Sequence, residues 1–220
     1  MKAEFLSAGA AGSLLDPDAV AWAQAQPHAV RMLGTPAAMQ PTEAIRAGWR
    51  ERPIGAVERV EVRAVHEGEH LFFRLEWADA TANRDHGDNR VFPDGAAVAF
   101  PVREGAPLVT MGAPGYPINA WFWRANEPER GRHVSAEGLG SSKTLDREHI
   151  RCRGVWRAGR WQVVIARALR LESPHPVVQL ETGARCHFGL AVWDGGRQER
   201  AGLKASSGEW LELELASVRS

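Results

Sequence analysis

The sequence has few cysteines, no surplus of either charge and no long apolar run. It has 220 residues, and its two cysteines, Cys152 and Cys186, are too few for a disulfide-rich scaffold or a four-thiolate zinc site. Lysine plus arginine (27) equals aspartate plus glutamate (27), so the basic excess typical of nucleic-acid-binding domains is missing. Charged residues and prolines interrupt every apolar stretch before the ~18 residues of a membrane-spanning helix. We therefore expect a soluble chain that neither binds nucleic acid nor inserts into a membrane.

Several catalytic motifs are also missing. There is no phosphate-binding G-x-x-x-x-G-K loop, no G-x-S-x-G elbow and no H-E-x-x-H pair. The eight histidines lack metal-ligand spacing and are interpreted as surface or turn residues. The N-terminus carries Glu4 and only a short apolar stretch, so it does not resemble a secretory signal peptide. Residues 1–13 are predicted to form a flexible extension. Spacing alone leaves open whether Cys152 and Cys186 pair.

Alternation of apolar and polar residues predicts a mainly β protein. Residues 57–66 and 70–77 alternate on either side of Glu67-Gly68, which indicates a hairpin. A second pair of strands is predicted within residues 154–169, joined at Ala158-Gly159. Residues 187–194 and 209–216 add two more strands. Six or more short strands with glycine-rich turns favour an antiparallel β-sandwich.

Helical patterns are scarce. Two short candidates begin near Asp16, with Pro17 behind it, and at Thr42. Residues 126–150 are polar and contain glycine, so a long loop is predicted there. The whole chain, residues 1–220, is expected to form one domain with a few short helices.

Residues 109–125 depart from ordinary sandwich composition. Glycines and prolines impose a turned backbone there, and an aromatic strand follows from Ile118. Met111 lies at this bend, and a methionine near tryptophans is most often core filler. Lys204 lies in a glycine-bounded turn before the last strand, where lysine is ordinarily solvated. If its amine were buried against a metal it would have to be neutral, but composition does not decide between these alternatives.

The order of these segments resembles a known family along nearly the whole chain, from about residue 14 to the final strand. It is similar to the haem b (gamma) subunits of the type II dimethyl sulfoxide reductase-like molybdoenzymes, which include those of ethylbenzene dehydrogenase, dimethyl sulfide dehydrogenase, selenate reductase and chlorate reductase. The segments that carry the resemblance are LLDPDAVAW, MQPTEAIRAGW, VEVRAVHEGEHLFFRLEWAD, FPDGAAVAFPV, MGAPGYPINAWFWRA, GVWRAGRWQVVIARAL and GLKASSGEW.

The resemblance implies one non-covalent haem b in a β-sandwich, with its iron between Met111 and Lys204. The absence of C-x-x-C-H fits a b-type haem. Trp121 and Trp123 are candidates for the pocket wall. If an alanine variant of Lys204 left the spectrum unchanged, the search for a ligand would move to two histidines in the predicted loop, His133 and His149. Arginines in predicted strands are candidates for holding the haem propionates, without a ranking among them: Arg74, Arg124 and Arg167.

The expected function is electron transfer by a non-catalytic subunit. The resemblance implies a heterotrimer with a molybdopterin catalytic subunit and an iron-sulfur subunit, a soluble cytochrome c or similar carrier, and a periplasmic location despite the unconvincing N-terminus. The alternative, of a different class, is a carbohydrate- or small-ligand-binding sandwich in which tryptophans stack on sugar rings.

Overall fold

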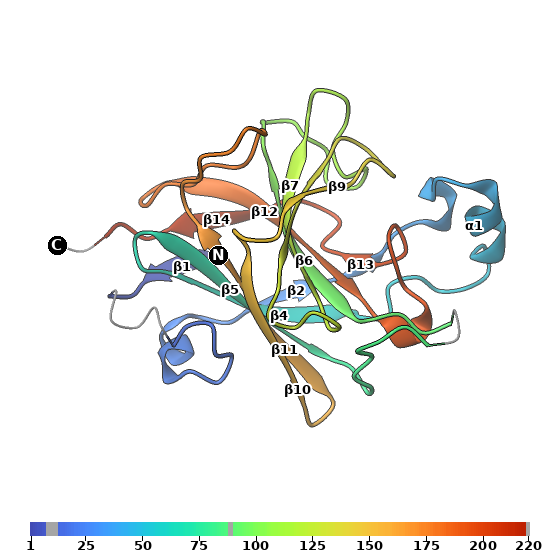
Figure 1. Cartoon of the computed structure of the whole chain (residues 1–220), viewed down its shortest axis with the longest axis horizontal. Helices are drawn as coiled ribbons and strands as arrows, with labels where there is room; N and C mark the ends of the chain where they lie inside the picture. The colour runs from blue at the N-terminus through green and yellow to red at the C-terminus, as the bar shows by residue number, and fades with distance from the viewer. Residues whose placement is uncertain (8–12, 88–89, 219–220) are drawn as a thin grey trace.

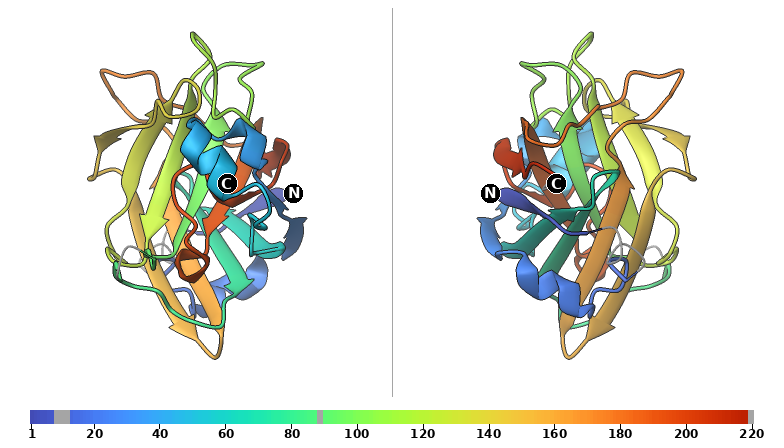
Figure 2. Two further views of the ribbon diagram at one scale, coloured as in Figure 1. Left: turned by 90° about the vertical axis from the view of Figure 1, so that its right-hand side faces the viewer. Right: turned by 90° about the vertical axis from the view of Figure 1, so that its left-hand side faces the viewer.

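Strands are the main regular element of the chain and pair into one continuous sheet. The computed structural model describes residues 1–7, 13–87 and 90–218. The strand order is β10-β11-β5-β4-β1-β14-β12-β6-β7-β8-β9, with β2, β3 and β13 attached beside this path. The two halves of this mixed sheet curve round to face each other (Figures 1 and 2). The strands are β1 (Lys2–Phe5), β2 (His28–Arg31), β3 (Leu33–Gly34), β4 (Arg59–His66), β5 (His70–Ala78), β6 (Gly95–Pro101), β7 (Ile118–Arg124), β8 (Arg132–Ala136), β9 (Lys143–Asp146), β10 (Arg151–Arg157), β11 (Arg160–Ala168), β12 (Arg185–Trp193), β13 (Ala205–Ser206) and β14 (Leu211–Leu215).

The mainly β prediction is confirmed, with one exception to antiparallel pairing. Strand β1 runs parallel to both of its neighbours, with Ala3 opposite Ala64 on β4 and opposite Leu215 on β14. Residues 2–5 are therefore part of the sheet, which corrects the expectation of a flexible extension for that stretch. Their polar character misled the sequence analysis, because only Ala3 of this strand is fully buried. Residues 8–12 of the predicted extension lie outside the described residues.

Both predicted hairpins form where alternation placed them. Strands β4 and β5 pair in antiparallel fashion, with Ala64 opposite Phe73. Strands β10 and β11 are joined by Ala158 and Gly159, whose φ angles of 50° and 76° are both left-handed. Two such residues define the hairpin turn whose twist matches that of the flanking strands. The remaining strands from residues 187–194 and 209–216 are β12 and β14.

The core between the facing sheet halves is aromatic. Phe73 on β5 lies 5.4 Å, ring centre to ring centre, from Phe188 on β12. Trp123 on β7 contacts Trp161 on β11 at 5.0 Å, edge to face. These rings are fully buried, and each buried aromatic side chain removes a large apolar area from water. Both cysteines are free.

Residues 126–150 contain two strands, not the single long loop that was predicted. Strands β8 and β9 lie at one edge of the sheet, and β8 pairs with β7. Both strands are short and mostly polar, and β9, the outermost strand, has no fully buried residue. This polarity hid β8 and β9 from the alternation test.

The helices are short. Thr42 caps α1 (Glu43–Gly48) as predicted, because its hydroxyl oxygen accepts a hydrogen bond from the backbone nitrogen of Ile45 at 3.3 Å. The first predicted helix is a 3-10 turn, η2 (Val20–Gln24), without a side-chain cap. Two further 3-10 turns are η3 (Ala37–Met39) and η4 (Gly195–Arg197). Among the described residues, no helix has the length and hydropathy needed to cross a membrane.

Candidate functional site

A cavity of about 600 Å³ lies on the outer face of the β6–β7–β12 half of the sheet. Its floor is made by the residues that alternate with the core-facing ones. Because successive residues of a strand point to opposite faces, the apolar core and this cavity share the same three strands. Five of the lining residues on these strands have small side chains or none: Gly95, Ala97 and Ala99 on β6, Ala120 on β7 and Ala191 on β12.

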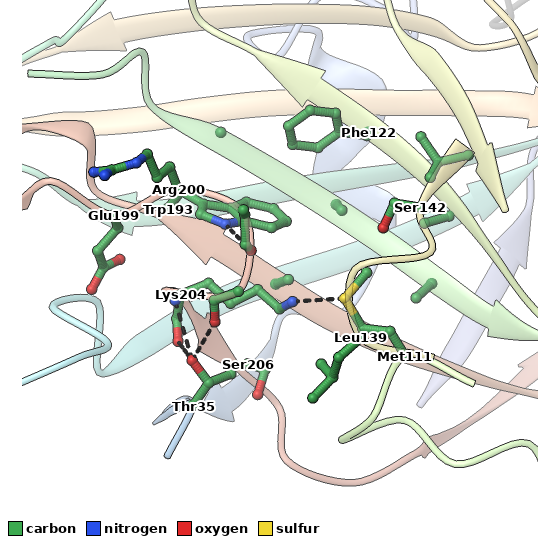
Figure 3. Close-up of a pocket in the computed structure, with 18 of the residues that line it drawn as sticks. Thr35, Met111, Phe122, Leu139, Ser142, Trp193, Glu199, Arg200, Lys204 and Ser206 are labelled. Carbon is green, nitrogen blue, oxygen red and sulfur yellow. Dashed lines mark hydrogen bonds between the residues drawn. The ribbon is translucent and has the colours of Figure 1, made fainter. Parts of the chain in front are cut away.

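The floor is flat because these small residues lie next to one another across the strands. Ala97 is opposite Ala191 on one side and Phe122 on the other. At Gly95, an added Cβ would come within 3.2 Å of the Phe122 ring and 3.4 Å of the Trp193 ring. The floor is thus an apolar surface bordered by two aromatic side chains, Phe122 and Trp193, which contact each other at 5.1 Å between ring centres (Figure 3). This is the lining expected for a planar apolar ligand.

Lys204 points into this cavity from the turn before β13. Its side chain is buried, and it forms no ion pair with any carboxylate in the described part of the chain. Burial lowers the pKa of Lys204 to about 8, since removal from water penalises the charged amine. Its Nζ lies 3.1 Å from the Sδ of Met111 and 5.5 Å from the centre of the Trp193 ring (Figure 3).

Hydrogen bonds hold the segment that presents Lys204. The Lys204 carbonyl accepts a hydrogen bond from the backbone nitrogen of Thr35 at 3.0 Å, and the amide of Gln40 donates to the Gly202 carbonyl at 3.1 Å. Glu199 is buried, and one of its carboxylate oxygens accepts from the backbone nitrogens of Gly55 and Ala56. These hydrogen bonds fix residues 199–204 to distant parts of the chain, and the Lys204 side chain extends from this fixed segment into the cavity.

Met111 lies in a strained turn on the opposite border of the cavity. Its φ of 59° is left-handed, and Gly112 follows at 86°. The Met111 nitrogen donates to the Leu108 carbonyl at 2.9 Å, and its carbonyl accepts from the nitrogen of Gly138 at 3.0 Å. A left-handed residue other than glycine costs about 1–2 kcal/mol and persists only where its surroundings impose it. The turn thus fixes the direction of the Met111 side chain.

We expect Gly112→Ala to destabilise the protein more than Gly115→Ala. Both glycines have left-handed φ angles, 86° and 76°. A Cβ at Gly112 would lie 2.7 Å from the carbonyl oxygens of Ala136 and Tyr116, whereas nothing lies within 4 Å of one at Gly115. Both variants carry the backbone strain, and only Gly112→Ala adds the clash, so an extra loss of roughly 1–3 kcal/mol is expected.

Urea unfolding of the two variants measures this difference. Equal unfolding free energies for Gly112→Ala and Gly115→Ala would contradict the close approach of the Ala136 and Tyr116 carbonyl oxygens to Gly112.

Positive side chains border the cavity. Arg132 is paired with Glu127 at 2.6 Å, whereas Arg124 forms no ion pair with a described carboxylate. Burial, together with the charge of Arg132, lowers the pKa of Arg124. Of the three arginines predicted as propionate partners, Arg124 is the one that lines the cavity. Arg74 donates a hydrogen bond to the Pro17 carbonyl and pairs with Glu76. Arg167 donates hydrogen bonds to buried carbonyl and amide oxygens.

Trp121 and Trp123 do not form the cavity wall, which corrects the expectation for both. They are fully buried on the core face of β7, where Trp121 packs on Phe100 with 4.6 Å between ring centres. Phe122, the residue between them, faces the cavity. Both faces of this strand are apolar, so composition alone did not show which face meets the cavity.

His133 and His149 also lie outside the cavity lining. The Nδ1 atoms of the two rings lie 2.9 and 3.0 Å from the two carboxylate oxygens of Asp146. The Nε2 atom of His133 lies 3.0 Å from the Asn119 Oδ1. These contacts occupy both nitrogens of His133 at the sheet edge, away from Lys204 and Met111.

Sequence comparison matches most of the chain to one family model. Residues 19–148 and 140–205 match the family model described as ethylbenzene dehydrogenase, and the matched range includes both Met111 and Lys204. The chain belongs to the ethylbenzene dehydrogenase family. The cavity, its small-residue floor and the Lys204–Met111 contact are therefore features of a member of this family.

Several relatives of the chain are named as subunits of larger enzymes. The chain is 39% identical over 159 residues to the chlorate reductase subunit gamma of Ideonella dechloratans, covering 72% of this chain and 65% of that protein. It is 29% identical to the dimethylsulfide dehydrogenase subunit gamma of Rhodovulum sulfidophilum, covering 89% and 73%. A protein of Haloferax mediterranei, provisionally named as a respiratory nitrate reductase heme subunit, is 30% identical over 86% of this chain and 67% of its own length. The match thus spans less than two thirds of the chlorate reductase subunit.

Structural comparison adds information about the fold alone. A carbohydrate binding module of family 9 from Caldicellulosiruptor kristjanssonii superposes with a TM-score of 0.52, covering all of this chain and 96% of that one, at 8% identity. All nine tryptophans of the present chain are described, and each is buried or half-buried. The exposed aromatic platform expected of a sugar-stacking module is therefore not formed by tryptophan here.

Proposed function

We propose that this chain is an electron-transfer subunit that binds one haem b in the cavity, with the iron held between Met111 and Lys204. The observation that carries the proposal is the 3.1 Å contact between the Lys204 amine and the Met111 thioether inside an apolar cavity. These side chains come from turns far apart in the sequence. Their convergence is hard to explain by stability, because burying an amine without an acidic partner is unfavourable.

The residues present fit a haem. The cavity of about 600 Å³ is within the range for small-molecule and cofactor sites, and its floor is flat and apolar. A thioether and a neutral amine are both suitable ligands for haem iron. The lowered pKa of Lys204 favours the neutral amine that coordination requires. Arg124, which lacks an acidic partner, offers a guanidinium for a propionate carboxylate.

The chain's own residues would favour electron transfer over substrate chemistry. Met111 and Lys204 would both hold the iron, so neither protein ligand would be left for oxygen or substrate to replace easily. The alanine floor and the rings of Phe122 and Trp193 would exclude water from the cavity around the ligand. When bound, haem supplies a one-electron redox couple, and soft sulfur ligation favours its reduced form.

The relatives' names support a place in a larger complex. Two of them are gamma subunits of a reductase and a dehydrogenase. We extend this to the present chain as a non-catalytic subunit in a heterotrimer with a molybdopterin catalytic subunit and an iron-sulfur subunit. It would pass electrons to or from a soluble carrier such as a cytochrome c, in the periplasm.

Reconstitution of the full chain with haemin tests the proposal. We expect a low-spin Soret band at one haem per chain, which sharpens and shifts on reduction with dithionite. A pyridine haemochrome assay would identify b-type haem. A protein that stays colourless after haemin treatment, and is retained on cellulose or another glycan resin, would instead support the carbohydrate-binding alternative.

Haemin affinity is expected to fall with decreasing pH. Coordination requires the neutral amine of Lys204, whose pKa is about 8, so a proton has to leave below that pH. The apparent affinity should therefore fall about tenfold for each pH unit below ~8 and level off above it. Lys143→Ala is the matched control, because Lys143 also lines the cavity but is exposed.

Haemin titrations from pH 6 to pH 9 measure this slope. It should persist in Lys143→Ala and disappear in Lys204→Ala. A slope that survives the loss of Lys204 would assign the proton to another group.

A further inference from the structure

Three carboxylates meet where strands beside the cavity begin or end. Asp79 directly follows β5, Asp94 directly precedes β6, and Asp194 directly follows β12. One oxygen from each lies within 4.8 Å of the others. Their neighbours in the chain, Gly95 and Trp193, line the cavity. The sequence analysis missed this cluster, because the three residues are far apart along the chain and join only through the sheet.

The cluster is negative and largely buried. Asp79 is 7% exposed and Asp94 is fully buried. Within the described ranges, neither they nor Asp194 form an ion pair with a basic side chain. Burial, and then the neighbouring carboxylate charges, raise the pKa of Asp79 to about 7. Burial likewise raises the pKa of Asp94 to about 6, despite its hydrogen bonds. Such an arrangement is unfavourable unless positive charge compensates it.

The Asp79 carboxylate has an unsatisfied oxygen inside this cluster. Its Oδ1 accepts a hydrogen bond from the Thr81 nitrogen at 3.0 Å. Its Oδ2 is inaccessible to solvent and has no hydrogen-bond partner among the described residues. A buried acceptor without a partner is uncommon in folded proteins and is often explained by an ion or a water.

The other oxygens of the cluster are held in place. Asp94 accepts hydrogen bonds from the nitrogens of Gly195 and Asn83, both at 2.8 Å, and from the Trp161 indole nitrogen at 2.9 Å. Asn83 brings a fourth oxygen to the site. A Cβ added to Gly196 would lie 2.6 Å from the Asn83 Oδ1 and 3.2 Å from an Asp194 oxygen, so these two oxygens border the same space.

We propose that Asp79, Asp94 and Asp194 form a Ca²⁺ site, with the Asn83 side-chain oxygen beside it. All of the candidate ligands are oxygens, which hard cations prefer and which do not favour zinc or copper. At Ca²⁺–O distances of about 2.3–2.6 Å, ligands on opposite sides of the ion are roughly 4.6–5.2 Å apart, which fits the spread of these atoms. Mg²⁺ requires shorter, near-octahedral coordination and usually retains several waters.

Such a site would fasten the wall of the cavity. The Gly195 carbonyl accepts from the Phe92 nitrogen at 3.1 Å, and Phe92 lines the cavity. The Asp194 nitrogen donates to Glu199 at 3.0 Å, in the segment that leads to Lys204. A cation joining the end of β5, the start of β6 and the end of β12 would therefore stabilise the segment that carries Lys204. The site does not depend on which ligand fills the cavity.

Thermal unfolding of the full chain tests the site. After dialysis against a chelator, addition of Ca²⁺ at a hundredfold excess over its dissociation constant should raise the Tm by about 5–10 °C. Tb³⁺ provides a direct probe, because Trp161 donates a hydrogen bond to Asp94 and is placed to sensitise its luminescence. We expect Tb³⁺ emission on excitation of tryptophan, displaced by Ca²⁺ and not by an equal concentration of Mg²⁺.

Asp79→Asn removes the charge of the unpartnered oxygen and keeps an acceptor for Thr81. This variant should lose both the Ca²⁺-induced rise in Tm and the Tb³⁺ emission. Its Tm in chelator should equal or exceed that of the parent, since a buried charge has been removed. Asp18→Asn is the control, because Asp18 is exposed and pairs with Arg157 at the surface. It should keep both responses.

Two results would overturn the proposal: a parent chain with neither a Ca²⁺ response nor Tb³⁺ emission, or an Asp79→Asn variant that responds as the parent does. If Asp79→Asn does not fold, the measurements on the parent decide. Displacement of Tb³⁺ by Mg²⁺ at the same concentration at which Ca²⁺ displaces it would then count against a calcium site.

Discussion

Lys204→Ala should lower haem affinity at least about 100-fold, because it removes one of the two groups proposed to hold the iron. Changes to residues that only orient metal ligands already cost about 10–100-fold in affinity, so loss of a ligand should cost more. The variant should nevertheless fold. The amine it removes is buried without an acidic partner, and its burial disfavours the charged form. Haemin titration monitored at the Soret band gives the affinity, and circular dichroism reports the fold.

Met111→Ala distinguishes ligation from a general effect on the cavity. This variant should retain haem more strongly than Lys204→Ala, since thioethers are weak ligands, but its spectrum should change from low spin to high spin because one protein ligand would be lost. Lys143→Ala should keep the parent spectrum. A low-spin spectrum in Met111→Ala that matches the parent would remove Met111 as a ligand, and the same result in Lys204→Ala would remove Lys204.

Ala97→Trp should abolish haem binding while leaving the protein folded. Ala97 lies in the middle of the cavity floor, between Phe122 and Ala191 on the neighbouring strands. An indole there would occupy the space above the floor, and the apolar lining would accommodate it. We expect a Tm within a few degrees of the parent, because the added ring enters a cavity and not the packed core.

Trp123→Phe is the control for Ala97→Trp, because it changes a residue on the core face and not one in the cavity. Trp123 is buried on the core face of β7, and its indole nitrogen donates to the Pro128 carbonyl at 3.0 Å. This variant should lose roughly 1–3 kcal/mol of stability and keep the parent haem spectrum. If Ala97→Trp bound haem normally while Trp123→Phe lost it, the ligand site would lie in the core and not in the outer cavity.

Alternation predicted those strands in which apolar core residues recur at every second position. It succeeded for β4, β5, β10 and β11, where turns with glycine also marked the strand ends. It failed for β8 and β9, because both are short and carry few apolar residues whose spacing could show alternation. It also failed to orient Trp121 and Trp123, since β7 is apolar on both faces and period-two patterning then carries no information about direction.

Composition and residue spacing alone did not predict the candidate site. Met111 and Lys204 each have an ordinary interpretation alone, and only the family resemblance paired them. The floor left a weak trace in the sequence, since Gly95, Ala97 and Ala99 alternate with Ala96, Val98 and Phe100, of which the last two are larger. The acidic cluster left none, because its members become neighbours only when β5, β6 and β12 are assembled.

The glycine and alanine floor also determines which residues lose conformational entropy when a ligand binds. Side chains of these residues have no rotamers to freeze, so a ligand in contact with them would meet a preorganised surface. The entropic penalty would fall on the two turns that carry Met111 and Lys204. Tuning of affinity is therefore expected to arise from the stiffness of those turns, while the floor stays the same.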